Sequence, residues 1–300
     1  MGNINLMPPE EVEQMFARSG GLALDVTNIH RKYLDCSYGD DPRQSLDIYL
    51  PNEGDGPFPV VFFLHGGAWQ HGRKDDIQLV SFIGGVSRGY AVVSIGYRLV
   101  PDIRYPENLF DVKAALRWVS KNADAYLLDS SRTALCGASA GAHLAMMAAF
   151  TQGQVAFGDE PGVPTCRILA VVEQFGPTDF VRFHAHYDES GFPRAYEPGA
   201  PNAVDAMLGV RALSISNLRR YFNPIDNVHP SVPPILLQHG RRDPIIPYQQ
   251  AADLYKKVIS VAGEGMAELD ISEDFLHADP GYATPEAASK VFDFIDKHLI

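Results

Sequence analysis

Short hydrophobic runs alternate along the chain with longer segments whose apolar residues recur at helical spacing. Apolar residues are nearly continuous at 60–64, 90–95, 132–136, 168–175 and 234–239. Runs of this kind suit strands that are buried on both faces, as in a parallel sheet. We therefore predict a core strand at each of these places and a further strand at 266–272.

The segments between and after these runs read as helices, at 107–122, 140–150, 248–261 and 285–299. In the last of them Ala288, Val291, Phe292, Ile295 and Leu299 form one apolar stripe. Alternating strands and helices predict an α/β fold, in which helices flank a mostly parallel central sheet. Two upstream segments, 31–38 and 44–50, are predicted to form a hairpin at the edge of this sheet.

Two regions depart from the alternation. Residues 1–30 are predicted to form an N-terminal arm with a helix at 8–17. Residues 178–232 are rich in Pro, Gly, His and Tyr and contain one expected helix, near 217–222. A long irregular insertion in a regular fold is typically a functional lid or cap. We expect residues 1–300 to form one domain in which 178–232 is a cap insertion.

Composition and charge narrow the function classes. The chain is 46% hydrophobic and 21% charged, which argues against disorder, and its net charge of -12 disfavours nucleic acid and anionic membranes as partners. Three cysteines without a C-x-x-C pair predict neither a disulfide framework nor a thiolate zinc site. The N-terminal residues do not resemble a secretory signal, and the apolar runs are too short to span a membrane, so we expect a cytoplasmic protein.

The third core run leads into Gly137-Ala-Ser139-Ala-Gly141, a G-x-S-x-G motif between a predicted strand and an Ala-rich helix. This context is that of a nucleophile elbow, a sharp turn that exposes a serine hydroxyl. A Cβ two residues before or after the serine would collide with the neighbouring strand or helix, which explains both glycines. We predict that Ser139 is a nucleophile.

A serine nucleophile needs a base, and the base needs an acid that orients it. In enzymes with this elbow the acid and then the histidine follow along the chain. Asp243 follows the strand at 234–239, and His277 lies between the strand at 266–272 and the last helix. We predict that Asp243 is the acid and His277 the base, with Asp274 and Asp279 as rival acids.

The loop after the first core strand has the sequence His65-Gly-Gly67-Ala68-Trp69. Its glycines let backbone N–H groups approach a substrate oxygen closely. We expect an oxyanion hole formed by the N–H groups of Gly67, Ala68 and Ala140. His65 is expected to brace the loop, and Trp69 either lines the substrate mouth or is a buried structural residue.

Other histidines have simpler explanations. The pair in His184-Ala-His186 lacks a carboxylate at metal-ligand spacing, so we interpret it as part of a polar cap segment and expect no metal. His143, one helical turn after Ser139, is expected to pack within its helix. The proposed chemistry needs no organic cofactor.

Taken in chain order, HGGAW at 65–69, GASAG at 137–141, GRRD at 240–243 followed by Pro247, and His277 resemble the α/β-hydrolase superfamily. The resemblance covers about 31–300 and is strongest to esterases with an HGG oxyanion loop, the hormone-sensitive-lipase-like branch. The segments 175–180 and 276–286 resemble feruloyl and acetyl-xylan (carbohydrate) esterases. Ala68, Ala138 and Ala142 depart from residues common in these groups.

The resemblance implies a serine carboxylic ester hydrolase that acts on short-chain, aryl or sugar esters through an acyl-enzyme. Its activity should fall below about pH 6–6.5, where an unperturbed histidine becomes protonated. An arylformamidase on the same triad is the alternative, and a non-catalytic ligand-binding module is a second. The expected partner is a neutral small-molecule or oligosaccharide ester, and a homo-oligomer is left open.

Overall fold

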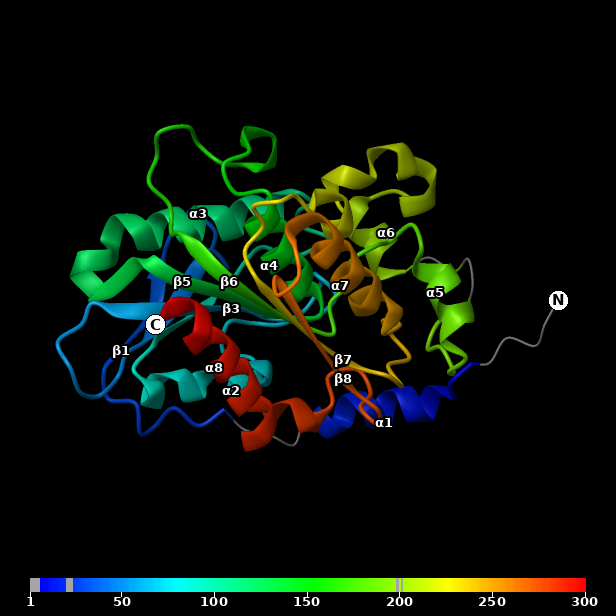
Figure 1. Cartoon of the computed structure of the whole chain (residues 1–300), viewed down its shortest axis with the longest axis horizontal. Helices are drawn as coiled ribbons and strands as arrows, with labels where there is room; N and C mark the ends of the chain where they lie inside the picture. The colour runs from blue at the N-terminus through cyan, green and yellow to red at the C-terminus, as the bar shows by residue number, and fades with distance from the viewer. Residues whose placement is uncertain (1–5, 20–23, 198–199, 201) are drawn as a thin grey trace.

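A computed structural model describes residues 6–19, 24–197, 200 and 202–300. Within these residues, eight strands form one sheet in the order β1-β2-β4-β3-β5-β6-β7-β8 (Figure 1). The pairs β1–β2 and β2–β4 are antiparallel, and the remaining neighbours are parallel. The strands are β1 (Lys32–Ser37), β2 (Ser45–Tyr49), β3 (Phe58–Leu64), β4 (Ala91–Ile95), β5 (Leu128–Ala138), β6 (Ile168–Gln174), β7 (Ile235–Gly240) and β8 (Ala267–Ser272).

Helices cover both faces of the sheet (Figure 1). On one face lie α3 (Glu107–Asn122), α4 (Ala140–Phe150) and α7 (Gln249–Ala262), and on the other lie α2 (Val80–Ile83) and α8 (Pro285–Leu299). Each strand contributes to the hydrophobic core on both faces of the sheet, because successive side chains point to opposite faces. In β3, Phe62 and Leu64 join the core under α3 and α4, whereas Val61 and Phe63 join the core under α8.

The predicted layout is confirmed in its regular part. The leading strands pair as an antiparallel hairpin at the sheet edge, and every predicted core strand is present within one or two residues, except that β5 extends well beyond the predicted 132–136. The helices at 107–122, 140–150 and 285–299 have the predicted bounds. The pattern analysis did not find the helical segment at 77–88, which consists of a short α-helix between two 3-10 helices.

Residues 178–232 leave the sheet after β6 and return at β7. The described part of this segment contains α5 (Phe183–Ser190), α6 (Ala203–Leu208) and two 3-10 helices, η5 (Ala212–Tyr221) and η6 (Pro224–Asn227). The single helix expected near 217–222 therefore overlaps a 3-10 helix that begins earlier and ends at Tyr221, and α5 and α6 were not predicted. That this insertion acts as a cap stays a prediction.

The N-terminal arm touches the same insertion. Helix α1 (Pro9–Ser19) matches the predicted helix at 8–17, whereas residues 1–5 and 20–23 of the arm lie outside the described part of the chain. The Met7 N–H donates to the Arg194 carbonyl at 2.9 Å, and the Ala195 N–H donates to the Pro244 carbonyl at 2.8 Å. The segment around Arg194 is therefore held between the arm and the loop after β7. Among the described helices, none is both long and apolar enough to cross a membrane.

Candidate active site

Ser139 lies on the tight turn between β5 and α4, in a backbone conformation that side chains rarely adopt, with φ 51° and ψ -117°. A Cβ on Gly141 would lie 2.1 Å from the Leu64 carbonyl oxygen, and one on Gly137 would lie 2.4 Å from the Gly141 carbonyl oxygen. Both glycines are therefore required by close backbone approach, as the motif predicts.

The structure brings Ser139, His277 and Asp243 into one hydrogen-bonded chain. The Ser139 hydroxyl lies 3.0 Å from His277 Nε2, and His277 Nδ1–H donates to Asp243 Oδ2 at 2.7 Å. All three side chains are buried. Because Nδ1 faces a carboxylate, the proton of a neutral His277 lies on Nδ1, and the lone pair of Nε2 is left for the serine proton.

The Asp243 carboxylate is stabilised in its ionised form. Its Oδ1 accepts the backbone N–H groups of Ile245 and Ile246, each at 2.8 Å. Burial alone would raise the pKa of Asp243, but the imidazoles of His277 and His239 outweigh it and lower this pKa to about 2. An ionised acid can orient His277 and balance the charge of its imidazolium.

The rival aspartates do not face His277 Nδ1. Asp279 shapes its own loop, where Oδ1 accepts the Gly281 N–H at 2.9 Å and Oδ2 accepts the Leu276 N–H at 3.4 Å. Asp274 lies in the turn after β8 and has no hydrogen bond with His277. Geometry therefore favours Asp243, as chain order does.

The three predicted oxyanion donors have no hydrogen-bond acceptor among the described residues. No bond is made by the N–H groups of Gly67 and Ala68, and Ala140 is the first residue of α4, whose N–H has no partner within the helix. Gly67 and Ala68 have φ values of 111° and 54°, which turn the loop sharply after β3. Ala68 and Ala140 line the same cleft as Ser139, and Gly67 does not.

His65 braces this loop from behind. Its Nδ1–H donates to the Gly66 carbonyl at 2.7 Å, and its own carbonyl accepts the Tyr97 hydroxyl at 2.7 Å. Its ring stacks on Tyr97, with centroids 4.3 Å apart. Burial lowers the pKa of His65 to about 4, so this imidazole is neutral near pH 7. The expected bracing role fits these contacts.

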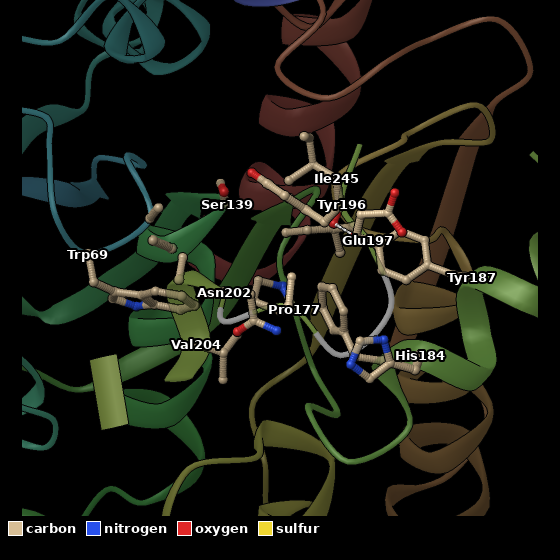
Figure 2. A pocket seen from close by; sticks show the side chains of 16 residues that line it. Trp69, Ser139, Pro177, His184, Tyr187, Tyr196, Glu197, Asn202, Val204 and Ile245 are labelled. Atoms are coloured by element: carbon tan, nitrogen blue, oxygen red, sulfur yellow. Dashed lines mark hydrogen bonds between the residues drawn. The ribbon is translucent and has the colours of Figure 1, made fainter. Parts of the chain in front are cut away.

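A cleft begins at Ser139 and extends beneath the 178–232 insertion (Figure 2). Trp69 is both buried and part of the wall, and it packs edge-on against His143 and Phe180. Figure 2 shows Tyr196 extending its hydroxyl end toward the Ser139 side of the cleft. The insertion also contributes Phe183, His184, Tyr187, Glu197, Asn202 and Val204.

The two histidines of the His184-Ala-His186 segment are separated in the structure. His184 lines the cleft, whereas buried His186 contacts Asp253 through Nε2 at 3.1 Å and Gln250 through Nδ1 at 2.8 Å. Within the described ranges, no group of three or more His, Cys, Asp or Glu side chains is arranged to hold a metal ion. His143 packs in the core and bonds the Phe222 carbonyl through Nε2 at 2.9 Å.

Sequence reasoning missed two sets of residues at this site. Tyr187, Tyr196 and Glu197 line the cleft, but the aromatic content of 178–232 was the only signal, and it fixes no position. The second set is Glu173 and His239, two buried residues outside the triad, of which His239 Nε2 lies 3.4 Å from Asp243 Oδ2. No motif in the sequence singles out either residue.

Comparison with known proteins places this geometry in a family. The chain is 31% identical over 252 residues to Esterase LipC of Mycobacterium tuberculosis (strain ATCC 25618 / H37Rv), a match that covers 81% of this chain and 59% of the relative. It is 29% identical over 245 residues to the isoprenylcysteine alpha-carbonyl methylesterase ICME of Arabidopsis thaliana, covering 81% and 55%. The chain therefore spans little more than half the length of these curated relatives.

A solved structure described as a bifunctional GH43-CE of Bacteroides eggerthii superposes with a TM-score of 0.78 at 28% identity, covering 89% of this chain and 35% of that one. The predicted α/β-hydrolase fold is confirmed by the strand order together with such neighbours. The BD-FAE family model matches residues 46–258, which is most of the chain. The protein belongs to the BD-FAE family.

Proposed function

We propose that this protein is a serine carboxylic ester hydrolase that uses Ser139, His277 and Asp243 and passes through an acyl-enzyme. The observation that carries the proposal is the unbroken hydrogen-bond chain from the Ser139 hydroxyl through His277 to the buried Asp243 carboxylate, at the end of an open cleft. The esterase names of the relatives support the same reaction class.

The reaction follows from the positions of the protons. His277 Nε2 takes the hydroxyl proton as Ser139 Oγ attacks the ester carbonyl carbon, and Asp243 stabilises the imidazolium that forms. The tetrahedral intermediate collapses as His277 Nε2–H protonates the leaving alcohol, which leaves an acyl-enzyme on Ser139. Water then attacks the acyl carbon as His277 Nε2 takes one of its protons. The second tetrahedral intermediate collapses as His277 returns that proton to Ser139 Oγ, which releases the carboxylic acid and restores the free enzyme.

The negative oxygen of each tetrahedral intermediate is proposed to bind the N–H groups of Gly67, Ala68 and Ala140. Support comes from the absence of any competing acceptor for these donors among the described residues. The start of α4 adds the positive end of a helix dipole at Ala140. Loss of one such donor typically costs about 3–4 kcal/mol of transition-state stabilisation.

The proposed substrates are short-chain, aryl or sugar esters without strong negative charge. Apolar and aromatic side chains dominate the wall, which suits an acyl chain or an aromatic ring. Asn202 and His184 supply polar groups that fit hydroxyls, and the Glu197 carboxylate disfavours an anion.

The cytoplasmic location, the lack of a cofactor and the oligomeric state stay predictions.

An arylformamidase is the second candidate because Trp69 of the HGGAW loop lines the cleft and offers a surface for an aromatic ring. The two activities separate when kcat/KM is compared for short-chain p-nitrophenyl esters and for N-formylkynurenine. The esterase proposal expects the esters to be preferred. A strong, saturable preference for the formamide would overturn it. Either enzyme should lose its activity in Ser139→Ala, whereas a binding module has no activity that depends on Ser139.

A further inference from the structure

Tyr196 carries a hydroxyl group that no described part of the protein uses. It belongs to the 178–232 insertion and lines the same cleft as Ser139. The residue is 45% exposed, and its hydroxyl makes no hydrogen bond with another described residue. Tyr187, from the same insertion, differs in that its hydroxyl donates to the Ile245 carbonyl. The Tyr196 hydroxyl is therefore free to bind a molecule that enters the cleft.

The backbone next to Tyr196 is tied to the loop that carries the proposed acid. The Ala195 N–H donates at 2.8 Å to the carbonyl of Pro244, which directly follows the acid in the chain. On the other side of Ala195, the Arg194 carbonyl accepts the Met7 N–H of the N-terminal arm at 2.9 Å. These two bonds hold the chain just before Tyr196 in place relative to the triad.

Tyr196 faces Ser139 from the side opposite the loop at 65–69, which carries two of the proposed oxyanion donors. In Figure 2, Ser139 lies between Trp69, the last residue of that loop, and Tyr196, whose hydroxyl end points toward Ser139. When the carbonyl oxygen of an ester binds the oxyanion donors, the other two groups on the carbonyl carbon project away from that loop. One of these two groups is the alcohol part of the ester.

The position of the proposed base indicates which of the two groups Tyr196 meets. His277 Nε2 must protonate the alcohol oxygen, so this oxygen lies on the side of Ser139 where His277 is found. His277 is bonded to Asp243 at 2.7 Å, and Tyr196 is tethered to the same loop and lies within the electrostatic reach of the Asp243 carboxylate. Tyr196 and His277 therefore approach the substrate from the side of the alcohol oxygen.

The Tyr196 phenol is suited to donate to an oxygen that gains negative charge. Partial burial in the cleft wall raises its pKa, and the Asp243 carboxylate raises this pKa further, so the phenol stays protonated near neutral pH. A hydrogen bond to a charged oxygen is stronger than one to a neutral oxygen. A bond from Tyr196 to the alcohol oxygen therefore strengthens as the transition state forms, which is what catalysis requires.

We propose that Tyr196 is a further catalytic residue, which donates a hydrogen bond to the alcohol oxygen of the ester while the bond between that oxygen and the acyl carbon breaks. The electron pair of the broken bond stays on the alcohol oxygen. His277 Nε2–H supplies the proton, so the O–H bond of Tyr196 stays intact. The tyrosine helps most when the alcohol is a poor leaving group. The inference rests on the ester hydrolysis proposed above and adds unactivated alkyl esters to its substrates.

The test compares two esters that form the same acyl-enzyme, p-nitrophenyl acetate and ethyl acetate, in wild type and in Tyr196→Phe. Because kcat/KM reports the steps up to release of the alcohol, the comparison isolates the alcohol part. p-Nitrophenolate carries its negative charge without help, whereas ethoxide does not. We expect kcat/KM of Tyr196→Phe to fall roughly 10- to 100-fold for ethyl acetate, as for loss of one hydrogen bond to a charged group, and by no more than about threefold for p-nitrophenyl acetate.

Tyr221→Phe is the matched control because it makes the same change in the same insertion but outside the cleft. Tyr221 is 53% exposed, and its ring packs on Phe157. Both esters should be hydrolysed by this variant at the wild-type rate. Tyr196→Phe should unfold at the wild-type temperature, because the lost hydroxyl has no partner within the described part of the chain. Thermal unfolding of both variants checks this.

Three results would overturn the proposal. Equal slowing of both esters in Tyr196→Phe would show that the residue only shapes the cleft, and unchanged hydrolysis of ethyl acetate would show that the hydroxyl has no role. A wild type that hydrolyses p-nitrophenyl acetate but not ethyl acetate would show that a poor leaving group receives no help. Failure of the proposed function is recognised separately, since Ser139→Ala would then hydrolyse the esters as fast as wild type.

Discussion

Replacement of Asp243 by asparagine tests the role of the acid most sharply, because the structure predicts how the amide will orient. The Oδ1 position faces two backbone N–H donors, those of Ile245 and Ile246. The Oδ2 position faces His277 Nδ1 at 2.7 Å and His239 Nε2 at 3.4 Å. An amide has one acceptor and one donor, so it can satisfy only one of these sides.

The magnitudes decide between the two orientations. If the NH₂ group faced the backbone donors, two buried N–H groups would lose their acceptor, at about 1–3 kcal/mol each. If it faces the imidazoles, His277 need only move its proton from Nδ1 to Nε2. The second orientation therefore dominates. His277 then directs an N–H at Ser139 Oγ and cannot accept its proton.

We expect Asp243→Asn to fold normally and to lower kcat by about 10⁴-fold, the loss typical of a triad acid changed to its amide. Circular dichroism and thermal unfolding check the fold, and steady-state hydrolysis of a p-nitrophenyl ester checks the rate. Asp279→Asn is the control, since an amide oxygen can still accept the Gly281 N–H at 2.9 Å and only the longer contact with the Leu276 N–H, at 3.4 Å, is lost. A folded Asp243→Asn variant with more than a tenth of the wild-type kcat would refute the reasoning.

Three further predictions follow from the same structure. Gly141→Ala should destabilise the protein by at least about 1–3 kcal/mol and abolish its activity, because the added Cβ would lie 2.1 Å from the Leu64 carbonyl oxygen. Gly84→Ala is the control: its Cβ would have no atom within 4 Å, so thermal unfolding should be unchanged. Burial lowers the pKa of His143 to about 4, so the free energy of unfolding is greatest above the unfolded-state pKa of about 6.5 and decreases as the pH falls toward 4. In urea titrations His143→Gln should remove about 3 kcal/mol of that decrease. An unchanged pH dependence would contradict this prediction. Ester hydrolysis should survive dialysis against EDTA, and a loss restored by a divalent metal would count against the mechanism.

Regular elements and chain order made much of this site predictable. The helices α3, α4 and α8 were predicted with their bounds from their composition and apolar spacing. Asp243 and His277 could be proposed because each follows a strand that the hydrophobic pattern indicates. The elbow glycines were explained by the same close approach that the structure contains.

The parts that were missed depend on tertiary contacts. Tyr196 reaches the cleft because the Ala195 N–H next to it bonds the Pro244 carbonyl, nearly 50 residues away, and no periodicity in 178–232 signals this. Glu173 and His239 lie on the same face of the sheet only because β6 and β7 are neighbours in a particular register. A one-residue shift of that register would place them on opposite faces, and local sequence does not specify it.

The central claim is that Ser139 is an activated nucleophile, and covalent labelling tests it most directly. A fluorophosphonate probe should add to the wild-type protein at one site, which peptide mass mapping should locate at Ser139, and Ser139→Ala should show neither labelling nor ester hydrolysis. Labelling at another residue, or hydrolysis at the wild-type rate by Ser139→Ala, would contradict the account.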